Sequence, residues 1–414
     1  MKLDGQLAGE KPRPGPDRSP SGWRAPGGKG QKKTIGIGMI GCGGMGRVVP
    51  RAVRKRTRRV VTTDLCDPEE QSLSAALEEL NPDARIHRDY RELVRAPEVD
   101  WVLIASWNRD HRDHAVAAFE AGKDVFCQKP LATSLEDCLA IKRAWEKSGR
   151  VFFIGFVLRF APHYRKIRRL LDRGAVGEII SLEFNETLEF NHGGFIMGDW
   201  RRLKKYAGSH LLEKCCHDID LANWFVGSRP RRVASFGGLD FFVPKNRRHI
   251  ERLGRDRKDR PAYRSWGGMI DRNPFTSDKD IVDNQVAIIE YENNVRAAFH
   301  TNLNAGIPER RMYILGTEGA LRADLLRGTI EVGRIGFRDR VKKYRLRVRG
   351  GHAGGDAVLG RVLADCMTRG GEPGVGMEDA LRASVACFGI DRAMETGRVV
   401  DLGPDWERAG GGVV

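Results

Sequence analysis

The segment 211–226 carries polar side chains suited to acid–base chemistry. We predict a helix here whose apolar residues run nearly all the way around, so the helix should be largely buried. Glu213, His217 and Asp220 nevertheless occur at positions i, i+4 and i+7, which share one helical face. Because buried polar groups are costly unless they are paired, this stripe either faces a site or forms an internal network. His217 is the candidate acid–base group, with Glu213 orienting it and Asp220 supporting the helix or a substrate.

A metal centre is the other kind of site that the residues of this segment could form. Cys215, Cys216 and His217 are consecutive, so their side chains diverge around a helix and cannot form a tetrahedral ligand set by themselves. We therefore predict no metal site.

A lysine follows a short apolar segment in the run Cys127-Gln128-Lys129-Pro130. If residues 123–127 form a strand, Lys129 lies just beyond its carboxyl end. There it is able to orient a hydroxyl or keto oxygen, or to take part in proton transfer during hydride transfer. A solvated lysine at a strand end would explain its position equally well.

A glycine-rich turn follows the apolar run 35–40, in a pattern typical of dinucleotide binding. Gly41 permits a tight turn, Gly43 leaves room for a pyrophosphate, and Gly46 lets the following helix pack close to the strand. Gly44 and Met45 complete the predicted phosphate-binding turn.

An acidic residue occurs at the expected distance beyond this turn. Asp67 lies 21 residues after Gly46, at the end of a predicted strand at 59–66, where a carboxylate would bind the adenosine ribose. A carboxylate repels a 2′-phosphate, so NAD is favoured over NADP. Asp64 competes for this role but sits mid-strand, and Asp67 is also readable as an ordinary turn residue before proline.

Two further polar clusters are candidates for ligand contacts. One follows the predicted strand at 99–105 and includes Ser106, Trp107, Asn108 and His111. The other precedes the His217 helix, and its polar and aromatic members suit a polyhydroxylated ligand, although an ordinary loop explains them nearly as well: Asn185, Glu186, Glu189, Asn191, His192 and Trp200.

The elements that must position these residues fall into two groups. From 34 to 157, predicted strands at 35–40, 59–66, 99–105, 123–127 and 151–156 alternate with helices, which indicates an α/β doubly wound parallel sheet. From 158 to 400 we expect an α+β domain with a large, mostly antiparallel open sheet. Its predicted members are helices at 162–174, 211–226 and about 377–396, and strands at 179–190, within 283–303, and at 329–332. Residues 1–33 and 401–414 are predicted tails, and 245–274 a basic surface insertion.

Composition narrows the class of protein. The net charge is +16, but no nucleic-acid recognition fold accompanies the basic segments. No stretch of 18 apolar residues exists, and residues 1–33 lack the apolar core of a secretory signal. The eight cysteines are irregularly spaced, which is typical of reduced residues in a cytoplasmic protein.

Taken together, these segments resemble the Gfo/Idh/MocA family of nicotinamide-dependent sugar and cyclitol oxidoreductases over about residues 34–400. The most specific match runs from Ala105-Ser106-Trp107-Asn108-Arg109-Asp110-His111, similar to the family's A-T-P-N-x-x-H, to Gln128-Lys129-Pro130, similar to its E-K-P. The segments 117–125, Gly155-Phe156 to Arg159-Phe160, and Gly316-Thr317-Glu318-Gly319 also fit family patterns.

The resemblance implies a Rossmann domain and assigns roles to residues. Lys129 would be the lysine that contacts cofactor and substrate, and His217 the catalytic histidine of a D-x-x-x-H element. Gln128 replaces the usual Glu and Glu213 the usual Asp, which alters charge and reach. The predicted cofactor site also takes in Gln128, and the predicted substrate contacts are Lys129, Arg159, Asn185, His192, Trp200, Glu213, His217 and Asp220.

The resulting prediction is an NAD-dependent oxidoreductase for a sugar, cyclitol or derivative, pairing with copies of itself through the exposed sheet face of the second domain. The alternative is a glycosidase of the same fold, in which a sugar is transiently oxidised, undergoes elimination and is reduced again, without net redox change. A binding protein without turnover is a third hypothesis, which the presence of both Lys129 and His217 disfavours.

Overall fold

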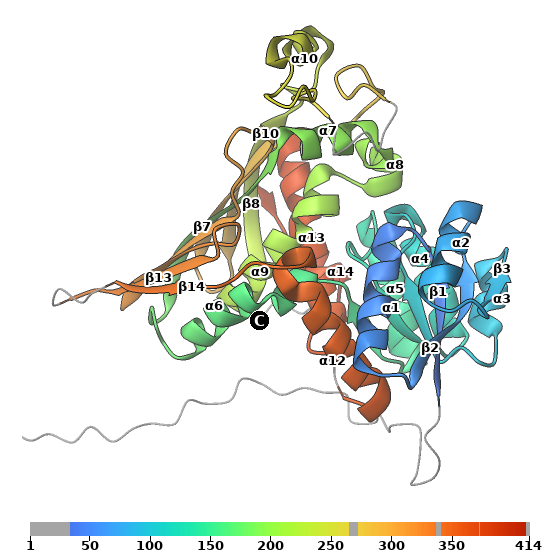
Figure 1. Ribbon diagram of the computed structural model, residues 1–414. Coiled ribbons are helices and arrows are strands. Elements are labelled where there is room, and N and C mark those ends of the chain that lie inside the picture. Colours follow the sequence, from blue (N-terminus) through green and yellow to red (C-terminus); the bar gives the residue numbers. More distant parts are fainter. Residues whose placement is uncertain (1–33, 265–271, 337–340, 372, 411–414) are drawn as a thin grey trace, which may run out of the picture.

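The computed structural model describes residues 34–264, 272–336, 341–371 and 373–410. Two sheets dominate it, one in the amino-terminal part and a larger one in the carboxyl-terminal part (Figure 1). The predicted amino-terminal tail 1–33 lies outside the described residues, as do parts of the predicted insertion (265–271) and of the predicted carboxyl-terminal tail (411–414).

The first sheet is a parallel, six-stranded sheet with the order β3-β2-β1-β4-β5-β6. Its strands are apolar and mostly buried on both faces, as expected where helices cover both sides. The strand order reverses between β1 and β4, and the glycine turn follows β1 at this point. The strands are β1 Ile35–Ile40, β2 Val60–Cys66, β3 Arg85–His87, β4 Trp101–Ile104, β5 Asp124–Cys127 and β6 Phe152–Ile154. The helices are α1 Gly44–Arg56, α2 Glu70–Glu79, α3 Tyr90–Arg95, α4 His111–Glu120 and α5 Leu135–Ser148.

The doubly wound parallel sheet predicted from the sequence is confirmed, with one strand missed. Ser134 caps α5 by accepting a hydrogen bond from the backbone of Asp137, and Gly149 ends this helix in the left-handed region. The short strand β3 was not predicted, because its three residues are largely exposed and show no apolar alternation.

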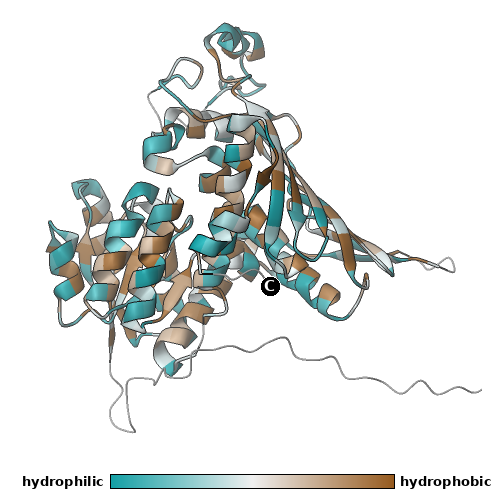
Figure 2. Ribbon diagram, turned by 180° about the vertical axis from the view of Figure 1, so that it is seen from behind, coloured by the Kyte–Doolittle hydropathy of each residue, from teal (hydrophilic) through white to brown (hydrophobic). Residues whose placement is uncertain are grey.

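The second sheet has nine strands in the order β14-β13-β12-β11-β7-β10-β9-β8-β15. Among the described residues β7 and β10 are the one parallel pair, so the predicted mostly antiparallel sheet is confirmed. Its strands switch repeatedly between hydrophilic and hydrophobic residues (Figure 2), since only one face is covered. The strands are β7 Ile179–Glu189, β8 Pro230–Gly238, β9 Asn284–Tyr291, β10 Arg296–Ala305, β11 Arg311–Gly316, β12 Gly319–Asp324, β13 Thr329–Arg334, β14 Lys342–Arg345 and β15 Val400–Asp401.

Helices of the carboxyl-terminal part cover the inner face of this sheet and reach the first sheet. The helix α13, Met377–Thr396, matches its predicted bounds and packs against α5, α9 and β8. The helix α12, Gly355–Arg369, was not predicted, and it packs on α1 (Figure 1). A Cβ on Gly360 would come 2.3 Å from the Cβ of Ala52, so the two helices are in close contact there. The remaining helices are α6 Pro162–Asp172, α7 Phe190–Gly198, α8 Lys204–Ala207, α9 Cys216–Val226, α10 Arg248–Leu253 and α14 Gly403–Arg408.

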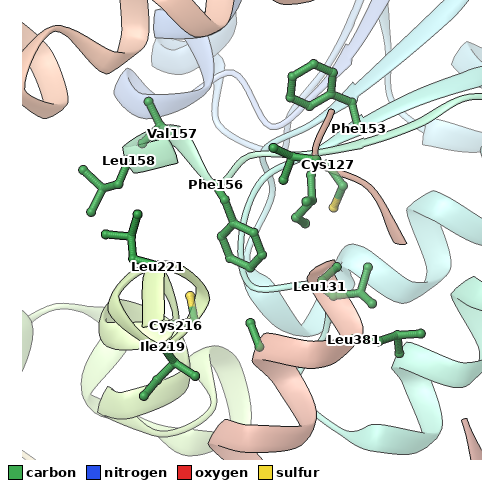
Figure 3. Close-up of a cluster of buried hydrophobic side chains, with 14 of the residues drawn as sticks. Cys127, Leu131, Phe153, Phe156, Val157, Leu158, Cys216, Ile219, Leu221 and Leu381 are labelled. Carbon is green, nitrogen blue, oxygen red and sulfur yellow. The ribbon is translucent and has the colours of Figure 1, made fainter. Parts of the chain in front are cut away.

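One apolar core runs through both parts of the chain. Figure 3 shows the ring of Phe156 among side chains from the first sheet and from α9, including Cys127, Leu131, Cys216 and Ile219. Phe156 is 1% exposed and belongs to the same cluster of buried residues as its neighbours from both parts. The site described below therefore lies on a rigidly packed junction.

Two predictions are corrected by these elements. The helix predicted at 211–226 begins as a π-helix, Leu211–Cys215, before α9 continues as an α-helix. Residues 401–410 are not a tail, since Trp406 of α14 is buried and its indole donates to the carbonyl of Pro230. The predicted surface insertion 245–274 is largely exposed in its described part; it contains α10, and its Ile250 and Tyr263 pack against a small separate core that includes Phe242 and Phe275.

Candidate active site

The glycine turn after β1 leaves open space above its backbone. Gly41 has φ +90°, and a Cβ there would lie 2.4 Å from the backbone of Ala105. A Cβ on Gly46 would lie 2.4 Å from the carbonyl oxygen of Gly41, so strand and helix pack tightly. Gly43 and Gly44, in contrast, have nothing within 4 Å of a Cβ. This space, at the amino end of α1 and beside the exposed Met45, fits a dinucleotide's diphosphate.

Asp67 follows the end of β2 beside the glycine turn. Its carboxylate accepts hydrogen bonds from the backbone N–H of Cys42 (2.6 Å) and of Glu69 (2.8 Å). Asp64, the other candidate for the ribose, is fully buried. Burial alone would raise the pKa of its carboxyl, but hydrogen bonds from Arg85 and His87 outweigh burial and lower this pKa. Asp64 is therefore committed to an internal network, and Asp67 stays the candidate for the ribose.

The cluster after β4 divides between structural and exposed members. His111 is fully buried, with Nδ1 2.8 Å from the carbonyl oxygen of Pro130 and Nε2 3.2 Å from that of Ser106. Asn108 is also buried, and its amide donates to the carbonyl of Ala207 (2.8 Å). The hydroxyl of Ser106 lies 2.9 Å from Nδ1 of His114. These groups hold the loop and tie it to the second part of the chain, so hydrogen bonding to a cofactor is not their visible role.

Aromatic rings from the amino-terminal and carboxyl-terminal parts of the chain meet at the edge of the first sheet that carries the glycine turn. Trp107, 41% exposed, stacks on Trp200 with 5.1 Å between ring centroids and 13° between planes. Tyr206 packs beside Trp107, and the guanidinium of Arg109 lies over both of these rings. Trp200, predicted as a substrate contact, is thus brought to the edge that carries the glycine turn.

Lys129 and Glu213 form a partly buried ion pair across the two parts. The ammonium of Lys129 donates to the backbone carbonyl of Glu213 and lies 3.3 Å from Oε1 of its carboxylate. Arg201 also donates to this carboxylate, at 3.2 Å. Although burial opposes ionisation, Lys129 and Arg201 hold the pKa of Glu213 far below its usual range. Gln128 packs against Gly155, because a Cβ on Gly155 would lie 2.6 Å from the side-chain oxygen of Gln128.

His217 lies at the start of α9, 4% exposed, beside this ion pair. Its ring centroid is 6.0 Å from that of Phe156 and 6.1 Å from that of His352. Burial, together with the positive charges of Lys129 and Arg310, lowers the pKa of His217 well below its ordinary value. The imidazole is therefore neutral near pH 7, so one of its ring nitrogens carries no proton.

Glu213 was predicted to orient His217, but no hydrogen bond joins these two side chains in the described part of the chain. Glu213 is engaged elsewhere, because its carboxylate pairs with Lys129 and Arg201. Arg201, which binds Glu213 instead, carried no periodic signal in the sequence. Nδ1 of His217 is buried without a hydrogen-bond partner in the described part of the chain.

Arg159 and Asp220 are not in the site. They form a buried two-pronged pair with N–O distances of 2.7 and 2.6 Å, and Arg159 also binds Asp379 at 3.0 Å. Their predicted role in contacting substrate is therefore corrected to a structural one. The ion pair links the segment after β6 to α9 and α13.

Asn185 and His192 have different surroundings. Asn185 bonds to Glu309 and to the backbone of Arg311, whereas its neighbour Glu186 faces α9 through Arg310 (3.0 Å). Since alternate strand residues face opposite sides, Asn185 lies on the outer face of the large sheet, away from His217. His192, on α7, lies nearer the site; burial and the charge of Lys214 lower its pKa to about 3.

Glu186, Cys215 and Asp218 bring three metal-ligand atoms within 4.8 Å of one another. Arg310, however, binds Asp218 at 2.8 and 2.6 Å and Glu186 at 3.0 Å, so a guanidinium already supplies the positive charge. The absence of a metal stays a prediction.

Comparisons with known proteins agree with this geometry. Residues 35–156 match the model described as an oxidoreductase family, NAD-binding Rossmann fold, and residues 164–322 match the GFO/IDH/MocA C-terminal domain. The chain is 27% identical to the 2,7-anhydro-N-acetylneuraminate hydratase of Mediterraneibacter gnavus, over 72% of this chain and 70% of that protein. It is 27% identical to the inositol 2-dehydrogenase/D-chiro-inositol 3-dehydrogenase of Lactiplantibacillus plantarum, over 52% of this chain and 57% of that one.

Solved structures show the same fold. A levoglucosan dehydrogenase in complex with NADH and levoglucosan superposes with a TM-score of 0.73, covering 89% of this chain and 99% of that chain at 20% identity. At this identity the likeness is evidence for the fold alone.

Proposed function

The chain belongs to the Gfo/Idh/MocA oxidoreductase family, and from that premise we propose that it is an NAD-dependent oxidoreductase acting on a CH–OH group of a sugar, a cyclitol or a derivative. The observation that carries the proposal is the Lys129–Glu213 ion pair beside the neutral His217. Lys129 follows a strand of the sheet whose glycine turn leaves space for a diphosphate.

In the proposed mechanism, the residues around the turn hold the cofactor. The open backbone at Gly43 and Gly44 would receive the diphosphate, and Asp67 the adenosine ribose. When bound, the nicotinamide supplies the hydride acceptor for oxidation of the carbinol carbon, or the donor for the reverse reaction.

The protein's own side chains manage the proton and the oxygen. His217, kept neutral, takes the hydroxyl proton in the oxidative direction. Lys129 donates a hydrogen bond to the same oxygen and stabilises the negative charge that develops on it. Glu213 and the backbone carbonyl it carries hold the ammonium in place, so Glu213 acts through Lys129.

An NAD-coupled absorbance screen over sugars, cyclitols and sugar acids tests this proposal. With a substrate in hand, Lys129→Ala and His217→Ala should each lower kcat by about 100-fold or more, the usual contribution of a positioned acid–base group. Asp365→Asn, at a partly exposed ion pair between α12 and Arg56 of α1, is the matched control that should keep full activity. Full activity in both site variants would refute the assignment.

A second function is favoured by one relative, a hydratase. The site would then oxidise a sugar transiently, eliminate a substituent and reduce the product, as in the glycosidase alternative. NAD that stays bound through purification, with substrate cleavage and no accumulation of NADH, would favour it.

We also propose a homodimer or homotetramer formed through the outer face of the large sheet. Phe236, Val286 and Ile288 are 77%, 50% and 58% exposed on neighbouring strands, and Phe236 pairs directly with Val286. Contiguous exposed apolar residues of this kind are typical of interaction surfaces. Sedimentation analysis of Phe236→Glu combined with Ile288→Glu should show monomers; an unchanged mass would contradict this interface.

We place the protein in the cytoplasm and propose two domains, residues 34–157 and 158–410, the second reaching beyond 400 because β15 and α14 pack on β8. All eight cysteines are free and buried, which suits a reducing compartment. Within the described residues, no helix is both long and apolar enough to cross a membrane.

A further inference from the structure

The loop before α12 has an unusual backbone beside His217. His352 and Ala353 adopt φ +45° and +56°, a region that L-residues other than glycine rarely occupy. The packing that follows holds the loop in this shape, since a Cβ on Gly355 would lie 2.7 Å from the carbonyl oxygen of Val157. Backbone strain of this kind persists where the surrounding structure enforces it, and it concentrates at functional sites.

The strained residue presents its side chain to the site. The ring of His352 lies 6.1 Å from that of His217, centroid to centroid, at 54°. This separation is too long for a direct hydrogen bond between the rings. It is short enough for hydroxyl oxygens on one substrate to reach both, at about 2.7–3.2 Å each. The His352 side chain is 30% exposed, so a ligand is able to reach it.

A carboxylate orients this second histidine. Oδ1 of Asp356 lies 2.9 Å from Nδ1 of His352. A carboxylate only accepts, so the Nδ1 nitrogen carries a proton, and Nε2 is left to contact a ligand. The same arrangement prepares the histidine of an Asp–His pair in hydrolases. The other Asp356 oxygen sits where a Cβ of Gly351 would be, at 2.0 Å, so the loop sequence is fitted to this carboxylate.

We propose that His352, oriented by Asp356, is a further substrate-contacting residue whose Nε2 forms a hydrogen bond with the hydroxyl next to the one that His217 deprotonates. The proposal rests on the proposed oxidoreductase function and narrows its substrate class to vicinal diols. Asp356 is a positioning residue, because it acts through His352.

The test uses the full-length enzyme with NAD and four probes: myo-inositol, scyllo-inositol, levoglucosan and glucose. His352→Ala should lower kcat/KM for the reactive probe by about 10-fold to 100-fold, mainly through KM, since a hydrogen bond to the substrate is lost. Asp356→Asn should give a smaller loss of the same kind, because the amide still reaches Nδ1 but favours the wrong tautomer. Asp365→Asn, the same substitution farther along α12 at an exposed pair with Arg56, should match the wild type.

A deoxy analogue of the reactive probe, lacking the hydroxyl on the carbon next to the oxidised one, makes the test specific. The wild type should discriminate against it by about 10-fold or more, and His352→Ala should discriminate little, because the two changes remove one interaction. Additive losses would overturn the contact. The proposal also fails if both variants lower only the melting temperature and leave kcat/KM per folded enzyme unchanged, which is the result of a loop that merely starts α12. Wild-type enzyme that oxidises none of the probes would instead overturn the proposed function, and this inference with it.

Discussion

Replacing two glycines of the same turn by alanine should separate cofactor binding from folding. Gly43 lies at an extended φ of −61°, and nothing approaches its Cβ position within 4 Å, so Gly43→Ala should change the free energy of unfolding by no more than about 0.5 kcal/mol. At Gly46 a Cβ would lie 2.4 Å from the carbonyl oxygen of Gly41 and 2.9 Å from the Met39 side chain. Gly46→Ala therefore forces α1 away from β1 and should lower the free energy of unfolding by about 1–3 kcal/mol.

The affinity for the cofactor should show the reverse pattern: Gly43→Ala should weaken NADH binding directly, and Gly46→Ala should not. The methyl group of Gly43→Ala enters the space where we expect the diphosphate, so the Kd for NADH should rise by at least about tenfold, which corresponds to about 1.4 kcal/mol. Gly46→Ala should weaken NADH binding only to the extent that the folded population falls.

Urea unfolding without cofactor and NADH fluorescence titration measure the two effects separately. Gly306→Ala is the matched control, since Gly306 is an exposed loop residue with nothing near its Cβ position. Wild-type NADH affinity in Gly43→Ala would show that no diphosphate lies over this turn. A Gly46→Ala protein as stable as the wild type would show that the packing of α1 on β1 has been misjudged.

Three further predictions follow from the same structure. Asp67→Ser should raise the Kd for NADH and lower that for NADPH, because the carboxylate that repels a 2′-phosphate is gone; fluorescence titration with both cofactors checks this, and unchanged selectivity would exclude Asp67 from the ribose site. Arg159→Met leaves Asp220 buried without its cation and should cost about 3–5 kcal/mol in urea unfolding, whereas a loss within experimental error would contradict a buried structural pair. Burial lowers the pKa of His210 to about 4 and that of His192 to about 3, so as the pH falls these histidines take up protons in the unfolded chain before they do so in the folded one. The free energy of unfolding should therefore be highest above pH 6.5 and fall as the pH drops toward 4, and it should fall less steeply in His210→Gln. Equal stability at pH 7.5 and pH 5 would refute this.

Local signals account for the part of the molecule that was predictable. Strands such as 35–40 are predictable from the sequence because a parallel strand is buried on both faces and must be apolar throughout. The ends of α5 follow from Ser134 and Gly149, whose side chain and backbone freedom act within one helical turn. The glycine turn and Asp67 are near each other in the chain, so their spacing alone predicts a dinucleotide site.

The tertiary structure decided which polar residues meet. Lys129 and Glu213 are 84 residues apart, and their pairing depends on how the two sheets dock. The i, i+4, i+7 stripe predicted one site for Glu213, His217 and Asp220, but Lys129 and Arg201 hold Glu213, whereas the buried Arg159 holds Asp220.

His352 shows the same limit most clearly. In the sequence it is one histidine in a glycine-rich run, and the helix after it was not predicted. Its place beside His217 exists because α12 packs back on α1, a contact between the two ends of the chain. Residue types and short spacings thus determined the fold class and the cofactor turn, because these depend on neighbours in the chain. The acid–base site was decided by packing, because its members come from distant segments that only the folded core brings together.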